Sequence, residues 1–331
     1  MNNTLLKGNL MKTLKSFYFL IVISSLLLGV ASMNASAADI DWGSVATKKV
    51  KVFYPGQASW DFLREQDHGT GAAPVKTHSK ACADCHVGEN GEYDVNADKI
   101  ITGDLQRSKS KEPLEPQGMP GAKGFKDLSL QAAYDAQNLY LRVSWPGSGA
   151  SVADPSLEER ADRISIQIAN KIGTFKKYGC FITCHDDEEE MPANRGEKTT
   201  LYGYYTRDKD NNVKPQGTLD GYLSKGQFID LIEASFVGKE VKTEDMHVLA
   251  AREKDHNDVT ASGSFANGTY TVVITRKLNT GDKGDITLED GKDFDIGIAI
   301  HDNKNHERKH YVSFPLSIGL SAPADVEAKK L

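Results

Sequence analysis

Alternating apolar and polar positions dominate the second half of the chain. They have a period of two and are separated by turns rich in Gly, Asn and Asp, which is typical of antiparallel strands with one buried face. The runs cover residues 139–145, 164–168, 270–275, 294–300 and 310–316. We therefore predict a mainly β chain whose main domain is an antiparallel β-sandwich. One helix is predicted over 227–236, with an apolar side made by Phe228, Leu231, Ile232 and Ser235.

The first half of the chain has few apolar runs. A short helix is predicted at Trp60–Arg64, followed by a Gly-rich segment. Residues 113–124 hold six Pro and Gly residues and predict a linker. The predicted organisation is a small, mostly irregular or helical module over 38–112, the linker over 113–124 and the sandwich over 125–331.

Residues 1–37 have the features of a secretory signal peptide. Lys12 and Lys15 precede an apolar stretch from Phe17 to Ala31, and the small residues Ala35-Ser36-Ala37 follow. The stretch is short for a membrane span of about 20 residues. We expect cleavage after Ala37, export to the periplasm of a Gram-negative bacterium, and no stable membrane insertion afterwards. The alternative is an uncleaved anchor helix.

Composition and charge restrict the partners. The chain is 39% hydrophobic and 26% charged, a balance that excludes a polytopic membrane protein. Its net charge is −6, and because residues 1–37 contribute three lysines and no acid, the rest carries −9. An acidic body argues against nucleic acid and favours a basic protein partner. The acidic run at residues 186–190 is either a solvated surface or part of such a docking surface.

Four cysteines form two motifs, each ending in histidine. Cys82, Cys85 and His86 form C-x-x-C-H, and the segment from Cys180 through Cys184 to His185 forms C-x-x-x-C-H. Thiols three or four residues apart lie on one side of a helical turn, so both can add to the vinyl groups of one porphyrin. The following histidine can then bind the iron. We predict two covalently attached haem c groups, with His86 and His185 as proximal ligands.

The second motif leaves alternatives open, because it is one residue longer than the usual pattern. Cys180 and Cys184 could instead form a disulfide, with haem b held there without covalent bonds. A zinc site would require both clusters to share one tetrahedral centre, which export and the paired Cys-His endings disfavour. No cysteine remains for an iron–sulfur cluster.

For the first haem, His68 is the favoured sixth ligand. It lies in a Gly-rich stretch long enough to fold back over the ring, although an exposed loop residue is the alternative. His78 is only four residues before Cys82 and would need a tight reversal. Met119 is a third candidate.

For the second haem, strand phase separates two histidines. His310 shares its face with Val312 and Phe314, so we expect it to point into the apolar interior. His301 shares its face with Gly297 and Ala299, which indicates either a solvent face or a flat floor for a porphyrin. His310 is favoured, with a hydrogen-bonded core histidine as the alternative.

Other candidate ligands for the second iron are weaker. Met191 and Met246 could bind through their thioethers, although methionines in such positions more often serve as packing. His306 lies among polar residues and is expected to be exposed.

From about Lys126 onward the chain resembles the haem-binding domain of the ethylbenzene dehydrogenase family. Those domains are the γ-like cytochrome subunits of molybdenum enzymes related to dimethyl sulfoxide reductase. The resemblance is carried by Ala133–Asp135, Leu139–Trp145, Ala161–Ile164, Gly179–Asp187, Asn267–Val272, Arg276–Leu278, Ala299–Asp302 and His310–Pro315.

The resemblance implies a β-sandwich with haem at one end of the sheets and a role in passing electrons. The well-known γ subunits hold haem b through Met and Lys, without thioethers. This chain departs from them at Cys180, Cys184, His185 and His310, and resembles a dihaem branch in which a small c-type module precedes the sandwich. A molybdenum partner is therefore implied by analogy only.

The predicted function is that of a periplasmic dihaem c-type cytochrome. It would carry electrons between a respiratory donor, such as a membrane quinol-oxidising cytochrome, and a redox partner such as the catalytic subunit of a molybdenum oxidoreductase. No nucleophile–base constellation stands out, so we do not predict an enzyme. The alternatives are a dihaem peroxidase or small-oxide reductase, or a haem-based sensor, each of which needs one iron with an open position.

Overall fold

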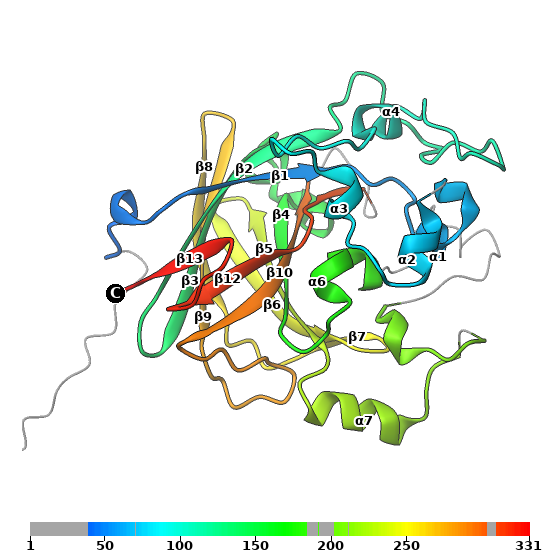
Figure 1. Ribbon diagram of the computed structural model, residues 1–331. Helices are drawn as coiled ribbons and strands as arrows, with labels where there is room; N and C mark the ends of the chain where they lie inside the picture. Colours follow the sequence, from blue (N-terminus) through cyan, green and yellow to red (C-terminus); the bar gives the residue numbers. More distant parts are fainter. Residues whose placement is uncertain (1–38, 70, 184–190, 192–201, 211, 303–308) are drawn as a thin grey trace, which may run out of the picture. The chain divides into compact units, whose positions relative to one another are not determined.

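The computed structural model describes residues 39–69, 71–183, 191, 202–210, 212–302 and 309–331 (Figure 1). All of them belong to one compact unit, Asn34–Leu331. The predicted signal peptide, Cys184, His185, His306 and the acidic run at 186–190 lie outside the described residues. Within the described ranges, no helix has the length and apolar character needed to cross a membrane.

Strands make up most of the regular structure, which confirms the mainly β prediction. They are β1 (Lys48–Phe53), β2 (Phe125–Tyr134), β3 (Asn138–Pro146), β4 (Arg163–Ala169), β5 (Ile229–Val237), β6 (Glu240–Val248), β7 (Arg252–Lys254), β8 (Thr260–Ala266), β9 (Thr269–Lys277), β10 (Lys292–His301), β11 (His310–Val312), β12 (Leu316–Leu320) and β13 (Val326–Lys330). Their order in one bent sheet is β7-β6-β5-β4-β10-β11-β1-β2-β3-β9-β8. β12 joins β10 to β13, and β13 pairs in parallel with β2.

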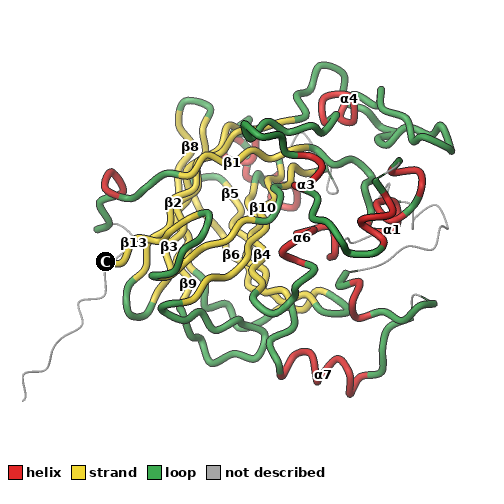
Figure 2. Tube along the Cα trace, in the orientation of Figure 1, coloured by secondary structure: helices red, strands yellow, loops and turns green. Residues whose placement is uncertain are grey.

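The helices are short and lie together beside the strands (Figure 2). They are α1 (Trp60–Arg64), α2 (Ala72–Lys76), α3 (Ala83–His86), α4 (Ala97–Ile101), α5 (Ala150–Ala153), α6 (Phe175–Tyr178) and α7 (Gln216–Ser224), with 3-10 turns η1 (Trp42–Ser44), η2 (Gln66–His68), η3 (Pro155–Arg160), η4 (Gly179–Thr183) and η6 (Tyr204–Thr206). The predicted helix at Trp60 is confirmed as α1. The Ser59 hydroxyl caps it by accepting a hydrogen bond from the Phe62 N–H at 3.2 Å.

The bent sheet folds over on itself to form a sandwich with an apolar interior. Ile296, Ile298 and Ile300 of β10 lie opposite Ile168, Ile166 and Ile164 of β4, and all six side chains are fully buried. Across the sandwich, the ring of Phe236 on β5 lies 4.7 Å from that of Tyr270 on β9. Burying each such side chain stabilises the fold by about 1.5–3 kcal/mol. This layer of isoleucines therefore fixes which face of β4, β5 and β10 points inward.

The helix predicted over 227–236 is wrong. Residues 229–237 form β5, which pairs with β4 on one side and β6 on the other. Both faces of this central strand are covered, so Leu231 and Ile232 are both buried although they point in opposite directions. Because Leu231 and Ile232 are consecutive and both apolar, the segment lacks the alternation of a strand with one buried face, and its spacing also fits one side of a helix.

The structure differs in detail from two other predictions. The run at 310–316 is divided into β11 and β12 by the segment Ser313–Pro315. Strand β1, from the predicted N-terminal module, inserts into the sheet between β11 and β2. The N-terminal residues thus contribute a strand to the sandwich as well as the surroundings of the first Cys-His motif.

Candidate functional site

A cavity of about 610 Å³ surrounds the first Cys-His motif. Its walls include Cys82, Cys85, His86 and His68, together with apolar side chains such as Phe62, Leu63, Val75, Ile100 and Leu114. The motif lies on α3, and the Cys82 N–H donates a hydrogen bond to the Lys177 carbonyl at 3.0 Å. That bond ties the first motif to the segment that leads into the second one.

His86 is held in the orientation of a metal ligand. Its Nδ1 lies 2.8 Å from the carbonyl oxygen of Asp94. Because a carbonyl can only accept, Nδ1 carries the proton and the Nε2 lone pair is left for coordination. A hydrogen bond on the outer nitrogen is the usual way in which proteins orient a coordinating histidine.

His68 faces His86 across the same cavity. It ends η2 and is followed by Gly69, whose φ of 102° turns the chain in a way that favours glycine. The two ring centroids are 6.0 Å apart. Two metal–imidazole bonds of about 2 Å each, with the half-widths of two rings, give roughly this separation. His68 and His86 therefore fit the two axial positions of one haem iron.

The surroundings of His68 keep its ring neutral. Burial lowers its pKa, the nearby His86 lowers it further, and a weak interaction with the Leu63 backbone opposes both. Its Nδ1 is buried and has no hydrogen bond of normal geometry. Neutral imidazole is the form that binds a metal.

The thiols of the first motif are available for covalent attachment. Cys82 and Cys85 are both free cysteines. Cys82 is buried, and burial, with a contribution from Cys85, raises the pKa of its thiol to about 12. A deeply buried, neutral thiol beside an open cavity fits a thioether position.

His78 and Met119 do not line this cavity. The ring of His78 stacks on Trp60 at 5.9 Å, with an angle of 12° between the planes. Its backbone has a φ of 56°, and Lys177 donates a hydrogen bond to its carbonyl. Among the candidates for the sixth position, only His68 lies opposite His86 in the described part of the chain.

A second cavity, of about 280 Å³, lies on the outer face of β4, β5, β10 and β11. Its walls include Cys180, Phe181, Thr183, Met191, Ala299, His301, His310 and Val312. The rest of the second motif lies outside the described residues, so the choice between thioethers and a disulfide at Cys180 stays open. Met191 is 4% exposed and lines the cavity, whereas Met246 packs in the core and does not.

His301 and His310 are direct partners in the β10–β11 ladder, with ring centroids 4.8 Å apart. Residues opposite each other in an antiparallel pair point to the same side. That side is the cavity face, because Ile300 and Tyr311 occupy the other one. The expectation that His310 points into the sandwich interior is therefore wrong, and both histidines reach the second cavity.

The strand under this cavity is flat where η4 crosses it. A Cβ atom added to Gly297 would lie 2.8 Å from the Sγ of Cys180, which is too close for any side chain. Gly297 thus allows the second motif to lie directly on β10.

Aromatic side chains separate the two cavities, and no sequence pattern predicts most of them. Phe181, between the two cysteines of the second motif, lines both cavities. Its ring lies 6.3 Å from Phe53, which lies 4.9 Å from Phe314, and Phe314 stacks against His86 at 6.5 Å. Only the position of Phe181 inside the motif could have indicated this wall in advance.

Two cytochromes c are similar to this chain over most of its length. A 32% identical relative, cytochrome c-552 of Stutzerimonas stutzeri, aligns over 89% of this chain and 92% of its own. Cytochrome c-551 of Rhodocyclus tenuis is 29% identical over 88% of this chain and 99% of its own. A solved structure of a putative carbohydrate-binding protein from Bacteroides uniformis covers 57% of this chain and 69% of its own, at 9% identity and a TM-score of 0.31. Such a low score carries no argument.

A protein-family match spans most of the chain. The family described as "Ethylbenzene dehydrogenase" matches residues 74–245 and 234–313. These ranges include the first motif, the second motif and the strands that carry His301 and His310. The chain therefore belongs to the ethylbenzene dehydrogenase family.

Proposed function

We propose that this protein is a dihaem c-type cytochrome that transfers electrons and is not itself an enzyme. The observation that carries the proposal is the pair of neighbouring cavities, each lined by residues of its own Cys-His motif and both bounded by Phe181. The names of the two relatives support haem c as cofactor and electron transfer as role. Bound haem supplies an iron that gains and loses one electron reversibly.

At the first site, Cys82 and Cys85 provide the thioether bonds, His86 is the proximal ligand and His68 is the distal ligand. The Asp94 carbonyl keeps His86 in the coordinating tautomer. Apolar walls exclude water from most of the ring. If His86 and His68 both bound the iron, no position would remain open for small molecules, and the site would favour electron transfer.

At the second site, Cys180 and Cys184 provide the covalent bonds and His185 the proximal ligand, with His310 as the favoured distal ligand and His301 beside it. Haem b held without thioethers is the alternative if the two cysteines form a disulfide. The stacking of the two histidine rings supports a site in which one binds the iron and the other positions it.

The wall between the cavities supports electron exchange within the protein. Phe181 touches both cavities, and Phe53 and Phe314 continue the contact toward His86. These side chains keep the two sites close without joining them, and they exclude water from the space between. Electrons entering at one site would therefore reach the other over a short, apolar separation.

The sequence of residues 1–37 and the net charge support a cellular location and a class of partner. We propose that residues 1–37 direct export to the periplasm and are then removed. The partners are redox proteins, with a membrane quinol-oxidising cytochrome as donor and the catalytic subunit of a molybdenum enzyme as one possible acceptor. The net charge of −9 outside residues 1–37 favours partners with a basic docking surface.

The mass of the mature protein tests the proposal directly. When the chain is produced with a cytochrome c maturation system, the expected mass is that of residues 38–331 plus two haems. A pyridine haemochrome spectrum should show haem c alone. A mass with one haem, together with extra haem b in the spectrum, would contradict covalent attachment at Cys180 and Cys184.

Replacing His310 with alanine tests the second site. We expect the His310→Ala variant to convert the second haem from low spin to high spin, because the iron loses its distal ligand, and to leave the first haem unchanged. Visible and electron paramagnetic resonance spectra measure this. His301→Ala is the matched control, since it removes a neighbouring ring from the same cavity wall. Loss of low spin in His301→Ala alone would assign the ligand to His301.

A further inference from the structure

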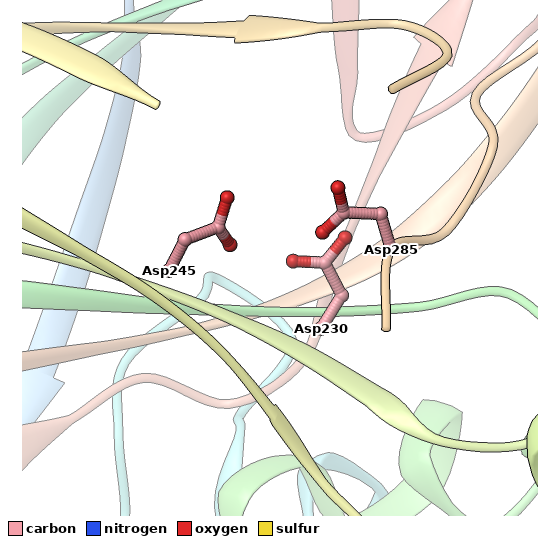
Figure 3. A group of neighbouring side chains, drawn as sticks. All are labelled: Asp230, Asp245 and Asp285. Carbon is pink, nitrogen blue, oxygen red and sulfur yellow. The ribbon is translucent and has the colours of Figure 1, made fainter. Parts of the chain in front are cut away.

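Three buried carboxylates meet inside the sandwich, away from both Cys-His cavities (Figure 3). Asp230 belongs to β5, Asp245 to β6, and Asp285 to the segment between β9 and β10. Asp230 and Asp245 take the inward phase of Ile232, which lies directly opposite Asp245 in the ladder. The three residues are 0%, 3% and 8% exposed, so water does not solvate their charges freely.

One positively charged side chain, that of Arg276, lies among the three carboxylates. Arg276, on the inward face of β9, forms an ion pair with Asp230, and its Nη2 lies 3.9 Å from Oδ1 of Asp285. One guanidinium balances one carboxylate, so the ionised cluster keeps a charge of about −2. Burial and the neighbouring carboxylates raise the pKa of Asp230 to about 6 and that of Asp245 to about 7, against the opposing effect of Arg276.

The hydrogen bonds leave several carboxylate oxygens facing the cluster without partners. Oδ2 of Asp230 accepts from Arg276 and from the Ile286 N–H, and Oδ2 of Asp245 accepts weakly from the Asp258 N–H. Oδ1 of Asp230, Oδ1 of Asp245 and both oxygens of Asp285 are buried and have no hydrogen bond. Buried oxygens without partners are costly, and a bound ion is one of the few ways to satisfy them.

The geometry matches a shared cation. One ligand oxygen from each carboxylate lies within 4.8 Å of the other two. Calcium–oxygen bonds are about 2.3–2.6 Å long, so two of them span about 4.6–5.2 Å. The donors are all oxygen, which selects a hard cation over zinc or copper. We propose that Asp230, Asp245 and Asp285 bind one divalent, oxygen-preferring cation of the Ca²⁺ type.

The cation would fasten three parts of the sandwich. It would link β5 and β6 to the segment that connects β9 with β10. It would also neutralise the negative charge of the carboxylates that Arg276 does not balance. Neither oxygen of Asp285 has a hydrogen bond, so this residue should provide the largest share of the binding. The site is structural, because none of the three residues lines a Cys-His cavity.

The test uses the haem-loaded, mature protein. Metal content is measured by mass spectrometry after purification without chelator, and Ca²⁺ binding is measured by calorimetry after treatment with EDTA. We expect about one Ca²⁺ per chain, and a rise in Tm of at least about 3 °C when Ca²⁺ is restored. Asp285→Asn should weaken Ca²⁺ binding at least tenfold, whereas Asp293→Asn, an equivalent change at an exposed position of β10, should not.

Two results would overturn the proposal. One is wild-type protein that holds no metal, binds no Ca²⁺ and keeps its Tm in EDTA. The other is Ca²⁺ binding of unchanged affinity in Asp285→Asn, which would locate the cation elsewhere. If Asp285→Asn does not fold, Asp245→Asn and the metal content of the wild-type protein decide the question by the same criteria.

Discussion

Replacing His68 with alanine is expected to convert half of the haem in the protein from low spin to high spin. His68 faces His86 at a ring separation of 6.0 Å, and neither His78 nor Met119 lines the first cavity. Its loss opens one axial position on the first iron. The reduced variant should then bind carbon monoxide at about one equivalent per chain, whereas the wild-type protein should bind almost none. Visible spectra and carbon monoxide difference spectra measure both effects.

The control is His78→Ala. His78 is also a half-buried histidine near the first motif, but it stacks on Trp60 and does not line the cavity. Its replacement should leave the spin state unchanged. Low-spin spectra in His68→Ala would contradict the assignment of the ligand. Sustained peroxide or nitrite turnover by the wild-type protein would contradict electron transfer as its role and favour the enzyme alternative.

The strands could be predicted because their burial alternates. β10 and β4 present isoleucines to the interior and polar or small residues to the other face, so a period of two is visible in the sequence. β5 could not be predicted in this way. Its outward face mixes the apolar Leu231 with the polar Glu233, both of which line the second cavity, and Asp230 lies on its inward face, so no period of two is visible.

The two Cys-His motifs could be recognised because each lies within a few consecutive residues of the chain. The distal ligands depend on contacts between distant segments. The phase of each strand was correct for His301 and His310, but only the register of β10 against β11 shows that the two share one face. The inference that Val312 and Phe314 mark the sandwich interior failed because the outer face is apolar where the cavities cover it.

The cluster of Asp230, Asp245 and Asp285 could not be predicted either. Asp230 and Asp245 lie on neighbouring strands, but Asp285 reaches them from a connection about 40 residues further along. No pattern in the sequence distinguishes these three aspartates from exposed polar residues. Arg276 likewise reads as the polar end of a strand, although it continues the buried row of Tyr270, Val272 and Ile274.

The largest loss of stability is expected on replacing Arg276 with methionine. Arg276 is 1% exposed and donates hydrogen bonds to the carboxylate of Asp230, to the Ile286 carbonyl at 2.7 Å and to the Lys277 carbonyl at 2.8 Å. Methionine retains most of the packing but leaves the buried Asp230 carboxyl without its cation. Breaking a buried pair in this way costs about 3–5 kcal/mol. Denaturant unfolding of the haem-loaded protein measures the loss.

A double variant separates the lost pair from lost packing. Removing both partners, in Arg276→Met with Asp230→Leu, leaves no unpaired charge from the pair, so part of the stability should return relative to Arg276→Met alone. Arg160→Met makes the same chemical change at an exposed position and should alter the free energy of unfolding by about 0.5 kcal/mol or less. A double variant less stable than Arg276→Met would contradict this expectation and show that Asp230 stabilises the fold through another contact, the hydrogen bond that it accepts from the Ile286 N–H. The fold would then depend on Asp230 as the link between β5 and the segment that carries Asp285, and less on the ion pair with Arg276.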